Sequence, residues 1–128
     1  MLSAKDIMTI DVFAVKKDTP VCEAIEVMLT HEVAGLPVVG ENDELLGVIT
    51  EKDALEFYNA DPSELKRPVE DFMTSPAVFF DENEPLPEIC RCLQTHTFRR
   101  VPVTSNGKVV GVISRPDVLK HILSQAGL

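Results

Sequence analysis

The chain carries the same sequence pattern twice, and this duplication constrains its fold more than any other feature. The residues Gly-Val-Ile-Thr-Glu-Lys-Asp at 47–53 return as Gly-Val-Ile-Ser-Arg-Pro-Asp at 111–117. The pair Met8-Thr9 returns in the same way as Met73-Thr74. Self-similarity at a fixed period indicates a repeated structural unit. We therefore expect two copies of one small fold, and an interface between copies is a natural place for a ligand.

Composition excludes several classes of function. The chain has 128 residues, 45% of them hydrophobic, which is enough for one compact domain or two half-domains. Its net charge of −9 argues against binding to nucleic acid as a polymer, because that needs a basic surface. No apolar run is long enough to cross a membrane, and the N-terminus lacks the apolar core of a signal peptide. We predict a cytoplasmic protein without membrane contact.

Each repeat reads as strand, helix, strand, strand, helix. We expect short strands within residues 8–15 and 73–80, and helices beginning at Pro20 and Pro85, with Thr19 as the first N-cap. The two further strands are expected at 36–39 and 45–50, and at 101–103 and 108–113, and the second helices at 51–58 and 116–123. The fold class is α/β (α+β). Repeat 1 spans residues 1–58, a polar linker spans 59–68, and repeat 2 spans 69–128.

The first helix of each repeat is predicted to bury one face in a shared core. Apolar residues recur there at helical spacing. They are Val21, Ala24, Ile25, Met28 and Leu29 in repeat 1, and Leu86, Ile89, Cys90 and Leu93 in repeat 2.

This order of elements, with Met-Thr near each start and Gly-Val-Ile-(Thr/Ser)-x-x-Asp after the third strand, resembles the cystathionine-β-synthase (CBS) domain. The resemblance covers nearly the whole chain, and two such domains in tandem form a Bateman module. It implies that the β-α-β-β-α repeats pack about a pseudo-twofold axis, and that two modules pair through their helices as a homodimer. It also implies a regulatory role rather than an enzymatic one.

The motif residues have a physical role of their own. Thr50 and Ser114 lie where a strand ends and a helix begins, and free N–H groups at such an end suit phosphate. Asp53 and Asp117 lie three residues further on, where a carboxylate can accept hydrogen bonds from a ribose diol. The alternative is that the hydroxyl residues only cap the helices and the aspartates only complement the helix dipole.

The resemblance implies that each nucleotide site takes residues from both repeats. Carried over to this chain, site A would consist of Thr50, Asp53, Ser75, Ala77, Phe98, Arg99, Arg100 and Val101. Site B would consist of Ser114, Asp117, Thr9, Ile10, Val12, Val33, Ala34, Gly35 and Leu36.

The two predicted sites differ in charge. Arg99 and Arg100 align with Ala34 and Gly35, so that only site A gains two guanidinium groups, which suit phosphate. The alternative is a solvated arginine pair that balances acidic neighbours. Arg115 is a candidate cation for site B. We expect site A to prefer phosphorylated adenosines such as AMP, and site B to bind more weakly or to take a ligand with less phosphate.

Other chemistry finds little support in the sequence. No nucleophile–base set is visible, and Cys90-x-Cys92 lacks the spacing of a metal site, so we predict no catalytic residue, no metal and no required cofactor. His31 and His96 lie at the ends of the first helices and are interpreted as dipole partners. Gly47 and Gly111 lie within strands, where glycine permits close packing or the approach of a ligand.

The favoured function is a sensor that binds AMP, ADP or ATP, with S-adenosylmethionine and NAD as further candidates, in clefts between the repeats. With no effector domain among these residues, it would signal to an effector protein whose identity is unknown. The competing hypothesis is a structural or dimerisation module with vestigial, unoccupied clefts.

Overall fold

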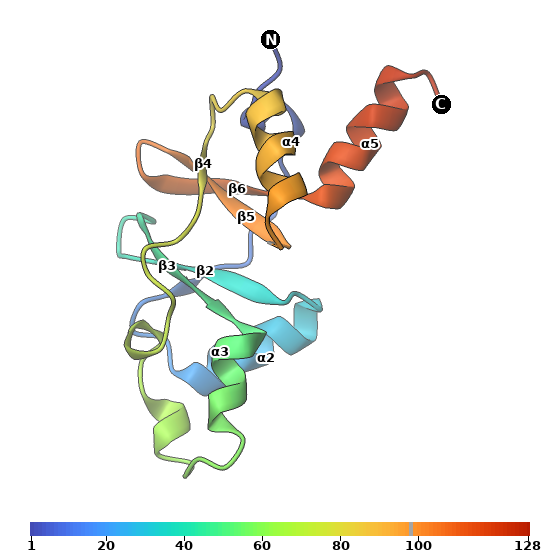
Figure 1. Cartoon of the computed structure of the whole chain (residues 1–128). Helices are drawn as coiled ribbons and strands as arrows, with labels where there is room; N and C mark the ends of the chain where they lie inside the picture. Colours follow the sequence, from blue (N-terminus) through green and yellow to red (C-terminus); the bar gives the residue numbers. More distant parts are fainter. Residues whose placement is uncertain (98) are drawn as a thin grey trace. The chain divides into compact units, whose positions relative to one another are not determined.

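The computed structural model describes residues 1–97 and 99–128, and its contacts divide the chain into two compact units. Unit 1 combines Met1–Val12 with Val78–Leu128, and unit 2 consists of Phe13–Ala77 (Figure 1). The first residues of repeat 1 therefore belong to the unit that is built mainly from repeat 2. The units do not coincide with the sequence repeats, and each is described by itself.

Unit 2 is built around a three-stranded sheet. Strand β1 (Val15–Lys16) pairs in parallel with β2 (Gly35–Val39), which pairs antiparallel with β3 (Leu45–Thr50). A parallel pair needs a crossover connection, and helix α2 (Val21–His31) provides it. After β3 come the short helix α3 (Glu51–Ala54) and three 3₁₀ turns, η1 (Leu55–Phe57), η2 (Glu64–Lys66) and η3 (Val69–Asp71).

Unit 1 repeats this order. Strand β4 (Phe80–Asp81) pairs in parallel with β5 (Arg100–Ser105), which pairs antiparallel with β6 (Lys108–Ser114). Helix α4 (Leu86–Thr95) makes the crossover, and helix α5 (Arg115–Gln125) follows β6 directly. The short helix α1 (Ala4–Ile7), near the N-terminus, completes the unit. The predicted mixed α/β class with two copies of one strand and helix order is confirmed.

Each unit has its own apolar core, so the prediction of one core shared by the two first helices was wrong. In unit 2, Val21, Ala24 and Met28 of α2 are buried with residues of β2 and β3. In unit 1, Ile89 and Leu93 of α4 are buried with residues of β5 and β6, and Ala4 of α1 joins them. Burial of a large apolar side chain contributes roughly 1.5–3 kcal/mol, so these helices are held mainly by their inner faces. The predicted inner faces are correct except at Leu29, which is 73% exposed.

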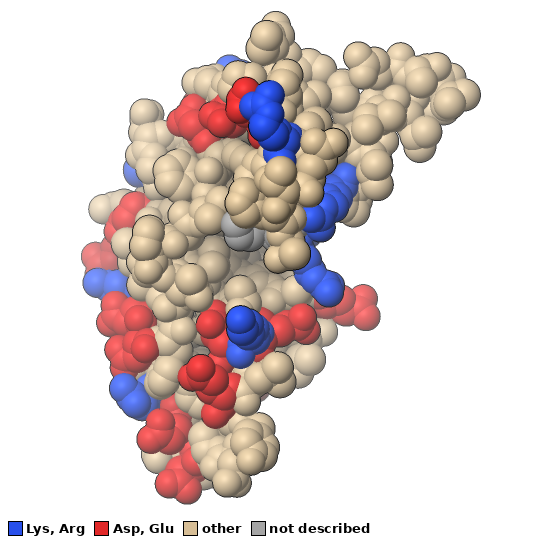
Figure 2. Space-filling view, viewed as in Figure 1, with Lys and Arg blue, Asp and Glu red and all other residues tan. Residues whose placement is uncertain are grey.

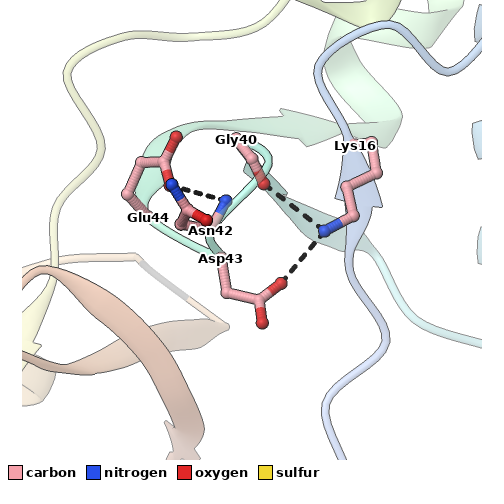
Figure 3. A network of polar contacts seen from close by, with 5 residues as sticks. All are labelled: Lys16, Gly40, Asn42, Asp43 and Glu44. Atoms are coloured by element: carbon pink, nitrogen blue, oxygen red, sulfur yellow. Dashed lines mark hydrogen bonds and ion pairs between the residues drawn. The ribbon is translucent and has the colours of Figure 1, made fainter.

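The hairpin turn of unit 2 is longer than that of unit 1. In unit 1, Asn106 and Gly107 have φ angles of 52° and 81°, as a two-residue type I′ turn requires. In unit 2 the longer turn at residues 40–44 is held by Lys16 of β1, as Figure 3 shows. Lys16 donates to the Gly40 carbonyl at 3.4 Å and to the Asp43 carboxylate at 3.1 Å.

Some local predictions were wrong. Pro20, not Thr19, is the N-cap residue of α2. Helix α3 ends at Ala54 and continues only as the 3₁₀ turn η1, so the helix predicted over residues 51–58 is much shorter. The first strand of each unit has only two residues. None of the helices in the described residues has the length and apolar character needed to span a membrane.

Candidate functional site

The end of the third strand has the same geometry in both units. At the end of β3, the Asp53 carboxylate oxygen Oδ2 accepts from the Thr50 N–H at 2.9 Å and from the Thr50 hydroxyl at 3.0 Å. At the end of β6, Asp117 Oδ2 accepts from the Ser114 N–H at 2.8 Å and from its hydroxyl at 2.9 Å. Both are capping boxes, in which residue N3 satisfies the N–H of the N-cap residue. Thr50 and Ser114 are thus the N-cap residues, as predicted, whereas the aspartates go beyond the predicted dipole role and use one carboxylate oxygen each to complete the capping box.

A second hydroxyl approaches each carboxylate from a distant part of the chain. Thr9 donates to Asp117 Oδ1 at 2.9 Å within unit 1. Within unit 2, the Thr74 hydroxyl lies 3.4 Å from Asp53 Oδ1 and 3.5 Å from Oδ2. The Met-Thr pair and the Thr/Ser-x-x-Asp motif of the sequence thus meet in space, and in each case the Met-Thr pair comes from the other repeat.

Backbone hydrogen bonds hold these threonines in place. Thr9 N–H donates to the Val112 carbonyl, and Val112 N–H donates to the Thr9 carbonyl, each at 2.9 Å. Thr74 and Val48 exchange the equivalent bonds at 2.8 and 3.0 Å. The threonine side chains can therefore rotate while their backbones remain fixed to β6 and β3.

The glycines of the motif make room for this approach. A Cβ atom at Gly47 would lie 2.6 Å from the Thr74 carbonyl oxygen and 2.8 Å from the Met73 sulfur. A Cβ atom at Gly111 would lie 2.5 Å from the Met8 sulfur and 3.0 Å from the Thr9 carbonyl oxygen. Of the two roles that the sequence left open for these glycines, close packing of the backbone accounts for both positions.

The remaining predicted residues of site A fall in different units. Ser75 and Ala77 follow Thr74 in unit 2, where the Ser75 hydroxyl donates to the Leu46 carbonyl at 2.9 Å. Arg99, Arg100 and Val101 belong to unit 1. Phe98 lies outside the described residues.

The remaining predicted residues of site B are divided in the same way. Ile10 and Val12 belong to unit 1 together with Ser114 and Asp117. Val33, Ala34, Gly35 and Leu36 belong to unit 2, where Gly35 pairs with Thr50 across β2 and β3. Ala34 also accepts a hydrogen bond from the Glu51 N–H at 2.9 Å. Within its unit, this segment therefore lies beside the Thr50 motif.

The arginine pair is free of internal partners among the described residues. Arg99 is exposed and Arg100 half-buried, and neither forms an ion pair or hydrogen bond with another described side chain. Arg100 pairs with Ser114 across β5 and β6, so its position within unit 1 is beside the Asp117 motif. Acidic side chains cover more of the face shown in Figure 2 than basic ones do, which makes two uncommitted guanidinium groups notable.

Arg115 has a structural role that the sequence did not reveal. Its guanidinium donates to the Leu93 carbonyl at 2.8 and 3.1 Å and also to the His96 carbonyl. These carbonyls lie at the C-terminal end of α4, where backbone acceptors lack partners within the helix and a cation is favourable. The side chain suggested as a cation for site B is therefore engaged in capping α4.

The histidines lie at the helix ends, as predicted. His31 is the last residue of α2, and its ring stacks on Phe13 with a centroid distance of 3.8 Å. His96 is the C-cap residue of α4, and its Nδ1 lies 3.1 Å from the Cys92 carbonyl oxygen. In the part of the chain that the structure describes, no three His, Cys, Asp or Glu side chains gather as a metal site requires.

An open cavity of about 440 Å³ lies elsewhere in unit 2. Its walls are acidic and aromatic, and none of the predicted site residues lines it. The lining residues are Glu56, Phe57, Asn59, Ala60, Asp61, Glu64 and Phe72.

Comparison with known proteins decides the family. The family model of the CBS domain matches the chain twice, over residues 4–60 and 69–124. The chain belongs to the CBS domain family. The predicted tandem CBS pair is thus confirmed. The family model gives both matched segments as CBS domains and indicates no catalytic family over them, in line with the prediction that these residues are not an enzyme.

Relatives of this CBS pair include proteins of different lengths. An uncharacterized protein of Methanocaldococcus jannaschii is 32% identical over 91% of this chain, which spans only 41% of that relative. Hypoxic response protein 1 of Mycobacterium tuberculosis is 28% identical, with 98% of this chain and 89% of the relative covered. Among solved structures, CBSX2 of Arabidopsis thaliana in complex with AMP is 29% identical, with a TM-score of 0.85 and coverage of 98% and 99%.

Proposed function

We propose that this chain is a sensor that binds adenosine-containing ligands through the carboxylates of Asp53 and Asp117. The observation that carries the proposal is the repeated carboxylate geometry, in which one oxygen caps a helix while the other is left to weaker or rotatable partners. A ribose diol donates two hydrogen bonds, and a fixed carboxylate is a suitable acceptor for them. The AMP complex of CBSX2, whose chain in that structure is covered to 99%, supports this ligand class.

The phosphate of such a ligand needs cationic partners on a chain with a net charge of −9. Arg99 and Arg100 are suitable, because guanidinium binds phosphate through paired hydrogen bonds and neither side chain is engaged with another described residue. The N-terminus of α5, an eleven-residue helix, adds a favourable dipole next to Asp117. The helix dipole of the four-residue helix α3, beside Asp53, is much weaker.

The output of the sensor is proposed to pass through an effector protein, with two copies of the chain paired as a homodimer. Helix α5 supports the pairing, because only Val118 among its residues is buried. Leu119, Ile122 and Leu123 are 51–59% exposed at spacings of three and four residues, which places them on one face of the helix. Such an apolar stripe is a suitable surface for the same helix of a second copy.

A ligand panel tests the proposal. Unfolding temperatures are measured with AMP, ADP, ATP, S-adenosylmethionine and NADH, for the native chain and for D53N, D117N and the double variant. A binder stabilises the folded state by about 2.7 kcal/mol at a hundredfold excess over its dissociation constant. Asparagine keeps one oxygen for the capping box but replaces the other acceptor with a donor. We therefore expect each single variant to lose one site and the double variant to lose the response.

The competing function is a structural module with unoccupied clefts. It predicts a flat response of the native chain to every ligand, together with an intact dimer in sedimentation analysis. A response that persists in the double variant would place binding away from these carboxylates and would contradict the proposed site.

A further inference from the structure

The two motif carboxylates differ in how many of their acceptor positions are occupied. A carboxylate offers about four lone-pair positions, two on each oxygen. In Asp117, both positions of Oδ2 are taken by the N–H and hydroxyl of Ser114, and one position of Oδ1 is taken by the Thr9 hydroxyl at 2.9 Å. One position is left, whereas a ribose diol needs two.

Asp53 is occupied to a smaller extent. Its Oδ2 accepts from the N–H and hydroxyl of Thr50, as in the other unit. The Thr74 hydroxyl, however, lies 3.4 Å from Oδ1, well beyond the usual 2.5–3.0 Å of an O–H···O hydrogen bond. Thr74 is also exposed, so water can take over its hydrogen bond, whereas Thr9 is half-buried. Asp53 therefore keeps both positions of Oδ1 for a ligand.

We propose that Thr9 competes with the ligand for the Asp117 carboxylate and sets the affinity of that site. This inference rests on the proposed function, in which a diol binds to the carboxylate. Because the backbone of Thr9 is held by two bonds to Val112, displacement of its hydroxyl requires rotation of the side chain and no movement of the strand. A diol that binds to Asp117 must break the charge-assisted hydrogen bond from the Thr9 hydroxyl. The corresponding contact at Asp53, from the Thr74 hydroxyl, is longer and therefore weaker. The two sites are thus unequal even for a ligand without phosphate.

The test uses the full chain in a D53N background, which leaves only the Asp117 site. Thr9→Val removes the hydroxyl and keeps the branched shape, and AMP affinity is measured by isothermal titration. We expect T9V to tighten AMP binding by about tenfold. This factor corresponds to the smallest contribution that a hydrogen bond to a charged group usually makes. T9S keeps the hydroxyl and is expected to bind as the parent does. The matched variant T74V in a D117N background is expected to change AMP affinity by less than about twofold, because the Thr74 contact is long.

A second ligand separates competition from a general loosening of the site. With 2′,3′-dideoxyadenosine 5′-monophosphate, which lacks the diol, the gain from T9V is expected to vanish. Circular dichroism of each variant establishes that it is folded. Equal or weaker AMP binding by folded T9V would overturn this inference alone, as would an equal gain with the dideoxy ligand. If neither the native chain nor T9V binds AMP, the proposed function fails, and this inference fails with it.

Discussion

The substitution Gly47→Ala is expected to destabilise the protein strongly, because this glycine marks the place where two distant chain segments touch. The added methyl group would lie 2.6 Å from the Thr74 carbonyl oxygen, a backbone atom that accepts the Val48 N–H. A flexible side chain could rotate away, but this carbonyl can move only by weakening the hydrogen bond that it accepts from the Val48 N–H in β3. Thr74 would then also move relative to Asp53.

The magnitude follows from the contacts. Overpacking of a tight site costs about 1–3 kcal/mol. The two backbone bonds between Thr74 and Val48 contribute about 1 kcal/mol each, and both weaken when the carbonyl shifts. Alanine restricts the unfolded chain and offsets about 0.4–1 kcal/mol. The net loss in free energy of unfolding is about 2–4 kcal/mol, a large share of the about 5–15 kcal/mol typical of a whole domain.

Two further glycines serve as matched comparisons. At Gly35, also in a strand, the nearest atoms to an added methyl group lie at 3.3 and 3.4 Å, so G35A is expected to cost less than about 1 kcal/mol. At Gly111 the nearest atom to an added methyl group is the sulfur of the flexible Met8 side chain, and the Thr9 carbonyl oxygen is 3.0 Å away. The loss of stability in G111A is therefore expected to lie between those of G35A and G47A.

Urea unfolding followed by far-ultraviolet circular dichroism measures these differences, since the chain has no tryptophan and only one tyrosine. At a constant slope m, a loss of stability lowers the urea midpoint in proportion. Equal midpoints for G47A and G35A would refute the reasoning, because it attributes the destabilisation to the smaller room for a methyl group at Gly47.

Three other variants test separate contacts. Arg115→Gln is expected to lower the free energy of unfolding by about 1–2 kcal/mol, because the C-terminal carbonyls of α4 lose a charged donor, and an unchanged melting temperature would contradict this role. The backbone N–H of Ser3 lowers the pKa of Asp6 below its usual 3.8, so the stabilising contribution of this carboxylate is present above that pH and is lost as the pH falls through the lowered value. Asp6→Asn is expected to remove the fall of the urea midpoint that titration of Asp6 causes at acid pH. An unchanged pH dependence in this variant would refute the stabilising role of the Asp6 carboxylate. The double variant R99A/R100A is expected to weaken AMP binding at the Asp53 site by about tenfold, in line with the family resemblance. Weakening at the Asp117 site instead would follow the pairing of Arg100 with Ser114, and unchanged affinity at both sites would exclude the arginines from phosphate binding.

Features governed by short-range rules could be predicted from the sequence. The inner faces of α2 and α4 follow from helical spacing, and the turn at Asn106 and Gly107 follows from the backbone freedom of those two residues. The capping boxes at Asp53 and Asp117 follow from a spacing of three residues. In each case the deciding interactions lie within a few residues along the chain.

Features that depend on distant contacts could not be read in this way. The assignment of Met1–Val12 to the unit of repeat 2 is decided by pairing between Thr9 and Val112, over a hundred residues apart in the chain. Arg115 is predicted as a ligand-binding cation because no pattern in the neighbouring sequence indicates that it contacts the C-terminal end of α4. One usable signal was present, since the Met-Thr pair and the strand glycine are both duplicated, and a tight backbone contact requires both partners.

The capping and ligand-binding interpretations of Asp53 and Asp117 are compatible, because they use different oxygens of the same carboxylate. The capping box fixes Oδ2 and thereby holds the orientation of Oδ1, whose free positions are what a ligand encounters. A carboxylate that is already oriented loses little side-chain entropy when it binds a diol, which favours affinity. The same argument makes the neighbouring threonine decisive, since Oδ1 is the only oxygen left and any hydroxyl bound to it competes directly. Differences between the two sites should therefore follow Thr9 and Thr74 as much as the arginines, and the T9V and R99A/R100A variants measure these two contributions separately.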